Sequence, residues 1–169
     1  MLPRTVVDRF KTADGNVLSL VSHDRDFYID IDGLELMSTR RTGSEVALAT
    51  LGCKGLETAR SPRVLIGGLG FGYTARAALD CLPDGAELVV ADLFEKVVEW
   101  NRTHAKDIWK GQLSDRRLRL VISDVWEQIG NGPWDAILLD TDNGPEFFCV
   151  EKNGRLYSCL LYTSPSPRD

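Results

Sequence analysis

The sequence lacks the signatures of several large protein classes. It has four cysteines, Cys53, Cys81, Cys149 and Cys159, and none of them form a CxxC pair. Scattered cysteines indicate reduced thiols rather than a disulfide framework or a metal site. No run approaches the ~20 apolar residues of a membrane helix, and the N-terminal stretch MLPRTVVDRF has no signal-peptide core. We therefore expect a cytoplasmic protein with no membrane segment and no metal.

A basic stripe is also missing. The chain has 20 Lys and Arg against 25 Asp and Glu, a formal net charge of −5. Nucleic-acid binders normally carry a basic face, so we expect no nucleic-acid partner. Mild acidity would suit a cationic substrate. The 169 residues, 43% of them hydrophobic, fit one soluble globular domain.

Residues 1–41 have the pattern of a small antiparallel sheet. The segments NVLSLVS and DFYIDID alternate apolar with polar residues and lie between the turn dipeptides Asp14-Gly15 and Asp32-Gly33. LELMS follows the second dipeptide. A period of two bounded by Asp-Gly predicts a β-meander of three strands.

A helix and a linker are expected over residues 42–62. Thr42 and Glu45 have the spacing of a capping box ahead of an apolar run. This predicts a helix from about Ser44 to Lys54, followed by a short linker.

From residue 63 onward, strand and helix patterns alternate. RVLIGG, AELVVAD, RLRLVISD and WDAILLDTD predict four buried strands, and EKVVEWNRTHAKDIW predicts one continuous helix. Such alternation predicts right-handed βαβ units and a parallel sheet. We therefore expect residues 63–158 to form a doubly wound α/β domain that binds a nucleoside.

The last stretch, CLLYTSPSPRD, has neither a strand nor a helix period. We expect residues 159–169 to be a non-native or disordered tail. A sheet begun in this way normally needs more strands to cover its fourth one. We accordingly expect a chain truncated at its C-terminus, with an incomplete sheet.

The loop after the first buried strand reads IGGLGFGYT. No Lys-Ser or Lys-Thr follows the glycines, which excludes a P-loop, and Tyr73 replaces the third glycine of a classical dinucleotide loop. Gly67, Gly68, Gly70 and Gly72 would let a ligand approach the backbone near a helix N-terminus. The alternative is tight helix–strand packing without a ligand.

Acidic residues follow the other three strands. Ligands of open α/β sheets bind at the carboxyl ends of strands, so these residues should converge on one crevice. Asp92 could accept hydrogen bonds from a ribose diol, and Asp124 with Val125 suits an adenine. Either aspartate could instead cap the next helix. Asp140 and Asp142, at i and i+2, could act as an acid–base pair or simply stabilise a turn.

Four segments in this order, GGLGFGYTARAALD, VVADLFEKVVEWNR, ISDVWE and WDAILLDTDNGP, follow a meander and a TGSE helix. Together they resemble the spermidine/spermine synthase family of polyamine aminopropyltransferases, in particular its bacterial spermidine synthase-like branch. The resemblance covers about Leu18 to Ser158. It implies an S-adenosylmethionine-dependent methyltransferase-like Rossmann fold.

The resemblance also implies a reaction and site roles. An aminopropyl group would pass from decarboxylated S-adenosylmethionine, a co-substrate rather than a tightly bound cofactor, to a polyamine, releasing methylthioadenosine. The glycine loop would approach the methionine-derived chain and the ribose. Asp92 would bind the ribose hydroxyls, Asp124 with Val125 the adenine, and Asp140 or Asp142 would lie beside the attacking amine. Family members commonly form homo-oligomers.

The chain departs from the family at three places. Its glycine loop, residues 67–73, has no acid, whereas the aminopropyltransferases carry an aspartate there that receives the ammonium of the aminopropyl group. Gly43-Ser44 replaces a Tyr-Gln-type pair, and the fourth strand ends Asp140-x-Asp142-Asn143 instead of D-x-x-D-P. An S-adenosylmethionine-dependent methyltransferase and a non-catalytic nucleoside-binding remnant therefore stay open as alternatives.

Overall fold

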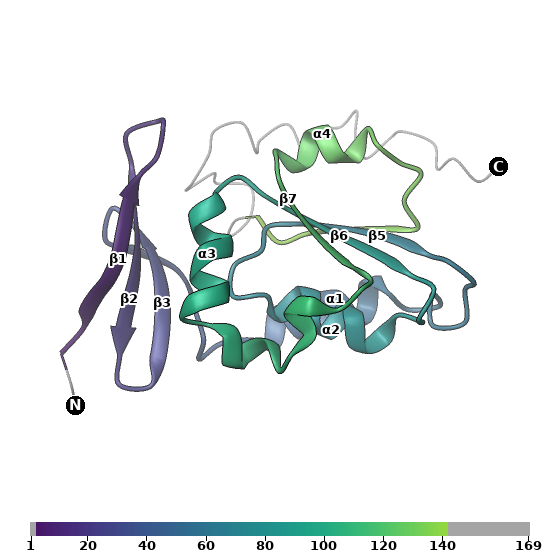
Figure 1. Cartoon of the computed structure of the whole chain (residues 1–169), viewed down its shortest axis with the longest axis horizontal. Coiled ribbons are helices and arrows are strands. Elements are labelled where there is room, and N and C mark those ends of the chain that lie inside the picture. The colour runs from purple at the N-terminus through teal and green to yellow at the C-terminus, as the bar shows by residue number, and fades with distance from the viewer. Residues whose placement is uncertain (1–2, 142–169) are drawn as a thin grey trace.

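The computed structural model describes residues 3–141, so Asp142 and the predicted C-terminal tail lie outside the described residues. These residues form two four-stranded sheets, with helices packed on the second (Figure 1). No helix within this range is long and apolar enough to cross a bilayer.

The first sheet is an antiparallel meander in the order β1-β2-β3-β4. Its strands are β1 (Thr5–Lys11), β2 (Val17–His23), β3 (Asp26–Ile31) and β4 (Leu34–Ser38). The predicted meander is confirmed, but the predicted count of three strands is wrong because β1 was missed. Most β1 side chains are exposed at the sheet edge, so its sequence has no clear burial period.

The second sheet is parallel, in the order β7-β6-β5-β8. It contains β5 (Arg63–Gly67), β6 (Glu87–Asp92), β7 (Leu118–Ile122) and β8 (Ala136–Leu139). All three strand pairs are parallel, as predicted. The chain runs outward from β5 through β6 to β7 and then returns to the other side of β5 with β8. This reversal of strand order is the switch point at which open α/β sheets bind ligands.

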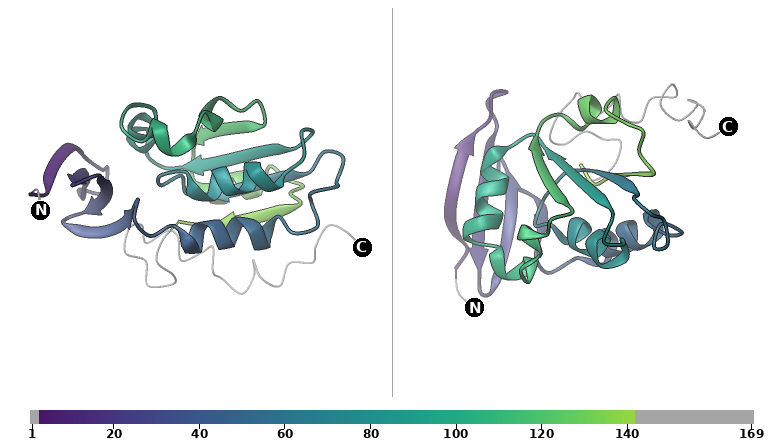
Figure 2. Two further views of the ribbon diagram at one scale, coloured as in Figure 1. Left: turned by 90° about the horizontal axis from the view of Figure 1, so that it is seen from below. Right: turned by 45° about the vertical axis from the view of Figure 1, so that its right-hand side comes forward.

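Helices cover both faces of the parallel sheet (Figure 2). The helices are α1 (Gly43–Gly52), α2 (Tyr73–Cys81), α3 (Glu95–Thr103) and α4 (Val125–Ile129), with short 3-10 turns η1 (Lys106–Trp109) and η2 (Gln112–Ser114). Because side chains alternate along a strand, Ile66 and Val90 face the core that contains α2 and α3, whereas Leu65 and Val89 face α4. The sheet is therefore doubly wound, as the fold prediction requires.

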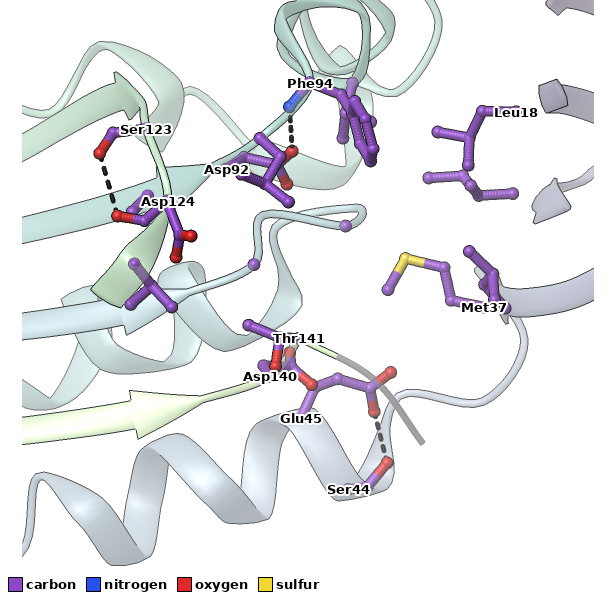
Figure 3. A pocket seen from close by; sticks show the side chains of 18 residues that line it. Leu18, Met37, Ser44, Glu45, Asp92, Phe94, Ser123, Asp124, Asp140 and Thr141 are labelled. Carbon is purple, nitrogen blue, oxygen red and sulfur yellow. Dashed lines mark hydrogen bonds between the residues drawn. The ribbon is translucent and has the colours of Figure 1, made fainter. Parts of the chain in front are cut away.

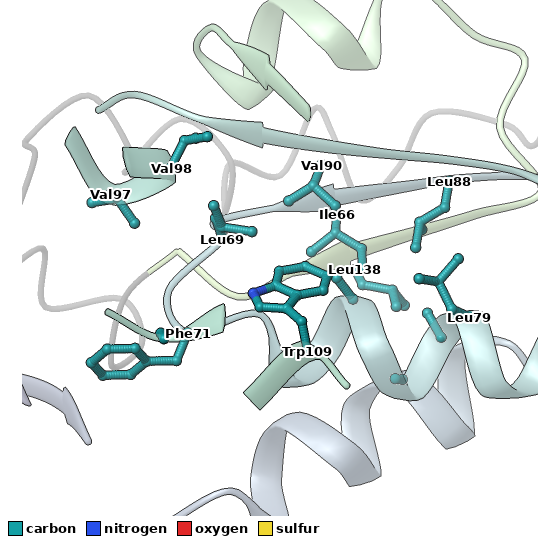
Figure 4. Packing of buried hydrophobic residues seen from close by; sticks show 14 of the residues in the cluster. Ile66, Leu69, Phe71, Leu79, Leu88, Val90, Val97, Val98, Trp109 and Leu138 are labelled. Carbon is teal, nitrogen blue, oxygen red and sulfur yellow. The ribbon is translucent and has the colours of Figure 1, made fainter. Parts of the chain in front are cut away.

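Two helix predictions need correction. Thr42 is the N-cap residue of α1, but its side chain makes no capping bond, and Glu45 accepts a hydrogen bond from Ser44 Oγ at 2.7 Å instead. The capping box is thus wrong. The helix predicted over residues 95–109 ends at Thr103, and the chain turns through η1 so that Trp109 enters the core (Figure 4). The indole Nε1 of Trp109 donates to Asn101 Oδ1 at 2.8 Å, which fixes this turn.

A cluster of contacts holds the meander against α3. Asp8 of β1 accepts a hydrogen bond from Trp100 Nε1 at 2.9 Å and pairs with Lys96 Nζ at 3.0 Å. The ring of Phe10 packs edge-on against Phe94 and Trp100, at 5.5 and 6.0 Å between centroids. The Trp100 hydrogen bond and the Lys96 ammonium lower the pKa of Asp8. The meander is therefore anchored beside the carboxyl ends of the parallel strands.

Candidate functional site

A cavity of about 180 Å³ lies between the meander and the parallel sheet (Figure 3). All four parallel strands end at it, as expected for a ligand site at the switch point. One wall comes from the segments that follow these strands, and the other from β2, β3, β4 and the first turn of α1. The strand-end residues in its lining are Gly68, Gly70, Ala91, Asp92, Leu93, Ser123, Asp124, Val125, Asp140 and Thr141.

Only two of the four predicted loop glycines, Gly68 and Gly70, line the cavity. Gly68 has φ 92°, and a Cβ there would collide with the backbone carbonyl of Asp140. A Cβ on Gly70 would collide with the Met37 side chain, which reaches over the loop from β4. The absence of Cβ atoms therefore lets both the β8 backbone and the meander come close to the loop.

Gly67 and Gly72 lie outside the cavity lining. Gly72 is the N-cap residue of α2 with φ 78°, and a Cβ there would overlap the indole of Trp109. Gly67 faces the side chains of Val125 and Thr141. For Gly72 the packing alternative accounts for the glycine, because the buried Trp109 fills the space that a side chain would need.

Asp92 ties the glycine loop to the end of β6. Its Oδ2 accepts the Leu69 N–H at 2.9 Å, and its Oδ1 accepts the Phe94 N–H at 2.8 Å. Burial raises the pKa of Asp92, and these two N–H groups oppose that rise. The N-cap residue of α3 is Phe94, so the helix-cap alternative for Asp92 is wrong. Each carboxylate oxygen has a second lone pair with which it can accept a ligand hydroxyl.

Asp124 caps α4 and lines the cavity at the same time. Its Oδ1 accepts the Trp126 N–H at 2.9 Å, so the helix-cap alternative is confirmed for this residue. Val125 is buried against Leu65 and Val89 and forms part of the cavity lining. The cap fixes the aspartate and the apolar side chain together. The predicted pair therefore lies in one wall of the cavity, and its adenine contact stays a prediction.

Asp140 follows β8 on the opposite side of the glycine loop. Its Oδ2 accepts a hydrogen bond from Thr74 Oγ1 at 2.6 Å, and its backbone N–H donates to Gly67 O at 2.8 Å. Burial raises the pKa of Asp140. The hydrogen bond from the Thr74 hydroxyl lowers this pKa, and the negative charge of Glu45 raises it further. Its predicted partner Asp142 lies outside the described residues, so the i, i+2 pair stays a prediction.

The meander and α1 contribute to the cavity although no site residue was predicted in them. Leu18, Ile29, Leu36 and Met37 form an apolar wall opposite the strand ends, and Glu45 adds a carboxylate. Glu45 was interpreted only as part of a capping box. The one signal in the sequence was its place in the TGSE segment, directly after the meander.

The cavity is acidic. Four carboxylates line it, from Glu45, Asp92, Asp124 and Asp140, and the described lining residues include no Lys, Arg or His. Within residues 3–141 no three His, Cys, Asp or Glu side chains gather closely enough to hold a metal ion. The charge of the cavity favours a cationic ligand over an anionic one.

Comparison with known proteins finds similarity at the level of structure. No family profile matches the chain, and no curated protein matches it. A spermidine synthase in complex with the transition-state analogue AdoDATO superposes with a TM-score of 0.65 and 19% identity, over 83% of this chain and 48% of that one. The spermidine synthase from Thermotoga maritima superposes with a TM-score of 0.65 and 21% identity, over 85% of this chain and 49% of that one.

The chain has the fold of these spermidine synthases. It spans about half the length of each of the two structures. The described residues thus have the predicted fold, an S-adenosylmethionine-dependent methyltransferase-like parallel sheet preceded by an antiparallel meander.

Proposed function

We propose that the chain belongs to a spermidine synthase-like aminopropyltransferase that moves an aminopropyl group from decarboxylated S-adenosylmethionine to a polyamine. The observation that carries the proposal is the acidic cavity, whose described lining holds four carboxylates and no basic side chain. The decarboxylated nucleoside has a sulfonium and an ammonium and no carboxylate, so it complements this charge. The shared fold with two spermidine synthases supports the same activity.

The rival activity is methyl transfer from intact S-adenosylmethionine. That molecule carries a carboxylate beside its ammonium, and a carboxylate placed among acids is repelled. Backbone N–H groups of the glycine loop could bind this carboxylate. The absence of an acidic residue in residues 67–73 therefore favours methyl transfer. The charge of the described cavity favours the decarboxylated form.

The strand-end residues would hold the nucleoside. Asp92, fixed by two backbone N–H groups, would accept the ribose hydroxyls. Asp124 and Val125 would hold the adenine, with a polar contact to its amino group and an apolar contact to its ring. Gly68 and Gly70 line the cavity, so the sulfonium end would lie beside the loop. Holding both reactants in one cavity in the correct orientation lowers the activation free energy by several kcal/mol in reactions of this type.

Transfer is a displacement at carbon. The lone pair of a neutral amine attacks the methylene beside the sulfonium, a C–N bond forms, and the C–S pair returns to sulfur as methylthioadenosine leaves. The new ammonium then gives up a proton. Asp140 would accept it, because burial raises the pKa of its carboxyl and a base works best with a pKa closer to the operating pH.

Calorimetric titration with decarboxylated and intact S-adenosylmethionine tests this function. We expect the decarboxylated form to bind about tenfold tighter or better, and methylthioadenosine to be released when a diamine is added. Equal or tighter binding of the intact form would overturn aminopropyl transfer in favour of methyl transfer. Binding without turnover would point to a nucleoside-binding remnant.

A further inference from the structure

A second, small cavity opens beside the main one. It has a volume of about 10 Å³, room for about one water molecule. Its lining includes Leu69, Phe71 and Tyr73 from the glycine loop and the start of α2. Three residues line both cavities: Met37, Glu45 and Asp140. The junction of the two cavities is therefore formed by one thioether and two carboxylates.

The two carboxylates at this junction reach it from different parts of the fold. Glu45 lies in the first turn of α1, whereas Asp140 follows β8. Both residues line the main cavity and the small one, and in Figure 3 the Glu45 carboxylate extends toward Ser44. The charge of Glu45 raises the pKa of Asp140, as expected for neighbouring acids.

We infer that Glu45 is the specificity-determining residue of this site: its carboxylate binds the primary ammonium of the aminopropyl group and selects the decarboxylated nucleoside. The inference rests on the proposed aminopropyl transfer and names a residue for it. Two neighbouring acids repel one another when both are charged, and a cation between them removes that repulsion. An ammonium also has three N–H donors, enough to reach both carboxylates.

The position of Glu45 agrees with a role toward a ligand. Its carboxylate does not cap α1, because the N-cap residue Thr42 takes no part in a capping box and the neighbour of the carboxylate is Ser44 Oγ. None of the nine salt bridges among the described residues involves Glu45. The glycine loop has no acid of its own, so a carboxylate for an ammonium at this end of the cavity must come from another element.

The other side of the junction is closed by apolar atoms. Met37 packs against Gly70, and Phe71 is buried in the hydrophobic core. These side chains make one flank of the junction apolar, and a charge-assisted hydrogen bond is stronger in less polar surroundings. Glu45 and Asp140 are thus the polar groups that the junction offers to a cation.

The test compares Glu45→Gln with Glu95→Gln in the 169-residue chain. Glu95 is a matched control, since it is an exposed acid in the first turn of α3 and lies outside both cavity linings. Each variant is titrated with decarboxylated S-adenosylmethionine and with methylthioadenosine, which has the nucleoside and lacks the ammonium. Thermal melts of both variants confirm that they fold.

We expect Glu45→Gln to weaken binding of decarboxylated S-adenosylmethionine by about tenfold to a hundredfold, the range for one charged hydrogen bond. Binding of methylthioadenosine should change less than twofold, and Glu95→Gln should change neither. Glu45→Asp, which keeps the charge on a shorter side chain, should recover part of the loss. If Glu45→Gln weakened the binding of both ligands equally, or of neither, the role of Glu45 would be overturned while aminopropyl transfer stayed intact. A wild-type chain that does not prefer the decarboxylated ligand would instead overturn the proposed function, and the role of Glu45 with it.

Discussion

The two sides of the cavity hold their carboxylates in different ways. On the side of β6 and β7, Asp92 and Asp124 accept backbone N–H groups of Leu69, Phe94 and Trp126. On the side of β8 and α1, Asp140 and Glu45 accept hydroxyl groups of Thr74 and Ser44. A backbone N–H is held in place by the chain, whereas a hydroxyl can rotate and can donate or accept. The first side is therefore suited to fixed binding of a ligand, and the second can adjust its hydrogen bonds when a ligand binds.

Replacement of the β8 acid should have the largest effect. Asp140→Asn removes the group that would accept the proton of the attacking amine, so we expect turnover to fall about a hundredfold or more. Affinity for methylthioadenosine should stay within twofold, because Asp140 lies on the other side of the cavity from Asp92 and Asp124. Initial rates of methylthioadenosine release measure the first effect and calorimetry the second. Unchanged turnover in an active preparation would remove Asp140 from the chemistry.

The fixed side should respond to Asp92→Asn with lost binding and lost stability. In asparagine an NH2 donor replaces one of the two carboxylate oxygens, so either the Leu69 N–H or the Phe94 N–H faces a donor and loses its acceptor. We expect the free energy of unfolding to fall by about 1–3 kcal/mol and methylthioadenosine to bind more weakly. Urea unfolding gives the first quantity. Stability equal to that of the wild type would mean that the two N–H bonds do not hold the loop.

Glycine substitutions separate packing from backbone strain. Gly72→Ala puts a methyl group into the Trp109 indole at φ 78°, whereas Gly55→Ala adds one at φ 89° with no atom within 4 Å. Both should lose stability through the positive φ, roughly 1 kcal/mol. Gly72→Ala should lose about 1–3 kcal/mol more from overpacking. Equal melting temperatures for the two variants would contradict the assigned role of Trp109.

The pH dependence of stability should also differ between carboxylates. Burial raises the pKa of Asp140 above 3.8, so the folded state holds its proton more tightly than the unfolded chain. Stability from this group is present at low pH and is lost as pH rises through the folded-state pKa. Asp115, bonded to Arg117, has its pKa lowered to about 2, so its contribution is present above pH 3.8 and is lost as pH falls toward 2. Denaturation between pH 2 and 8 should show a smaller loss of stability above pH 3.8 for Asp140→Asn, and a smaller loss between pH 3.8 and 2 for Asp115→Asn.

The smallest effect concerns the coupling of the two junction acids. Removing the negative charge in Glu45→Gln should lower the pKa of Asp140, because that charge raises it in the wild type. Carbon-13 NMR of the aspartate carboxyl groups can follow the titration. An unchanged Asp140 titration would show that the two carboxylates do not sense each other, and the Glu95→Gln chain serves as the reference.

Much of the fold could be predicted because its signals are local. RVLIGG and AELVVAD are continuous apolar runs, and they form the central strands β5 and β6. The edge strand β1 was missed because its exposed side chains leave no period. The break after Thr103 was missed because the residues around it still fit a helical stripe, and what ends the helix is the packing of Trp109 beneath Gly72.

The candidate site was predictable on one side only. Asp92, Asp124 and Asp140 follow strands, and parallel strands bring their carboxyl ends to one edge, so their convergence follows from topology. Glu45 and Met37 belong to elements whose positions depend on tertiary contacts, such as those of Asp8 with Trp100 and Lys96. No local period shows where such elements will lie.

The sequence by itself determined the three later strands of the meander, the parallel sheet and the acids at its strand ends, because burial periods and turn residues act over a few neighbouring positions. Only the tertiary structure decided which glycines face the cavity, that Trp109 fills the space beside Gly72, and that Glu45 meets Asp140 at the junction. These contacts join residues far apart in the chain. Their energies come from side chains that meet only after the meander and both faces of the sheet have packed.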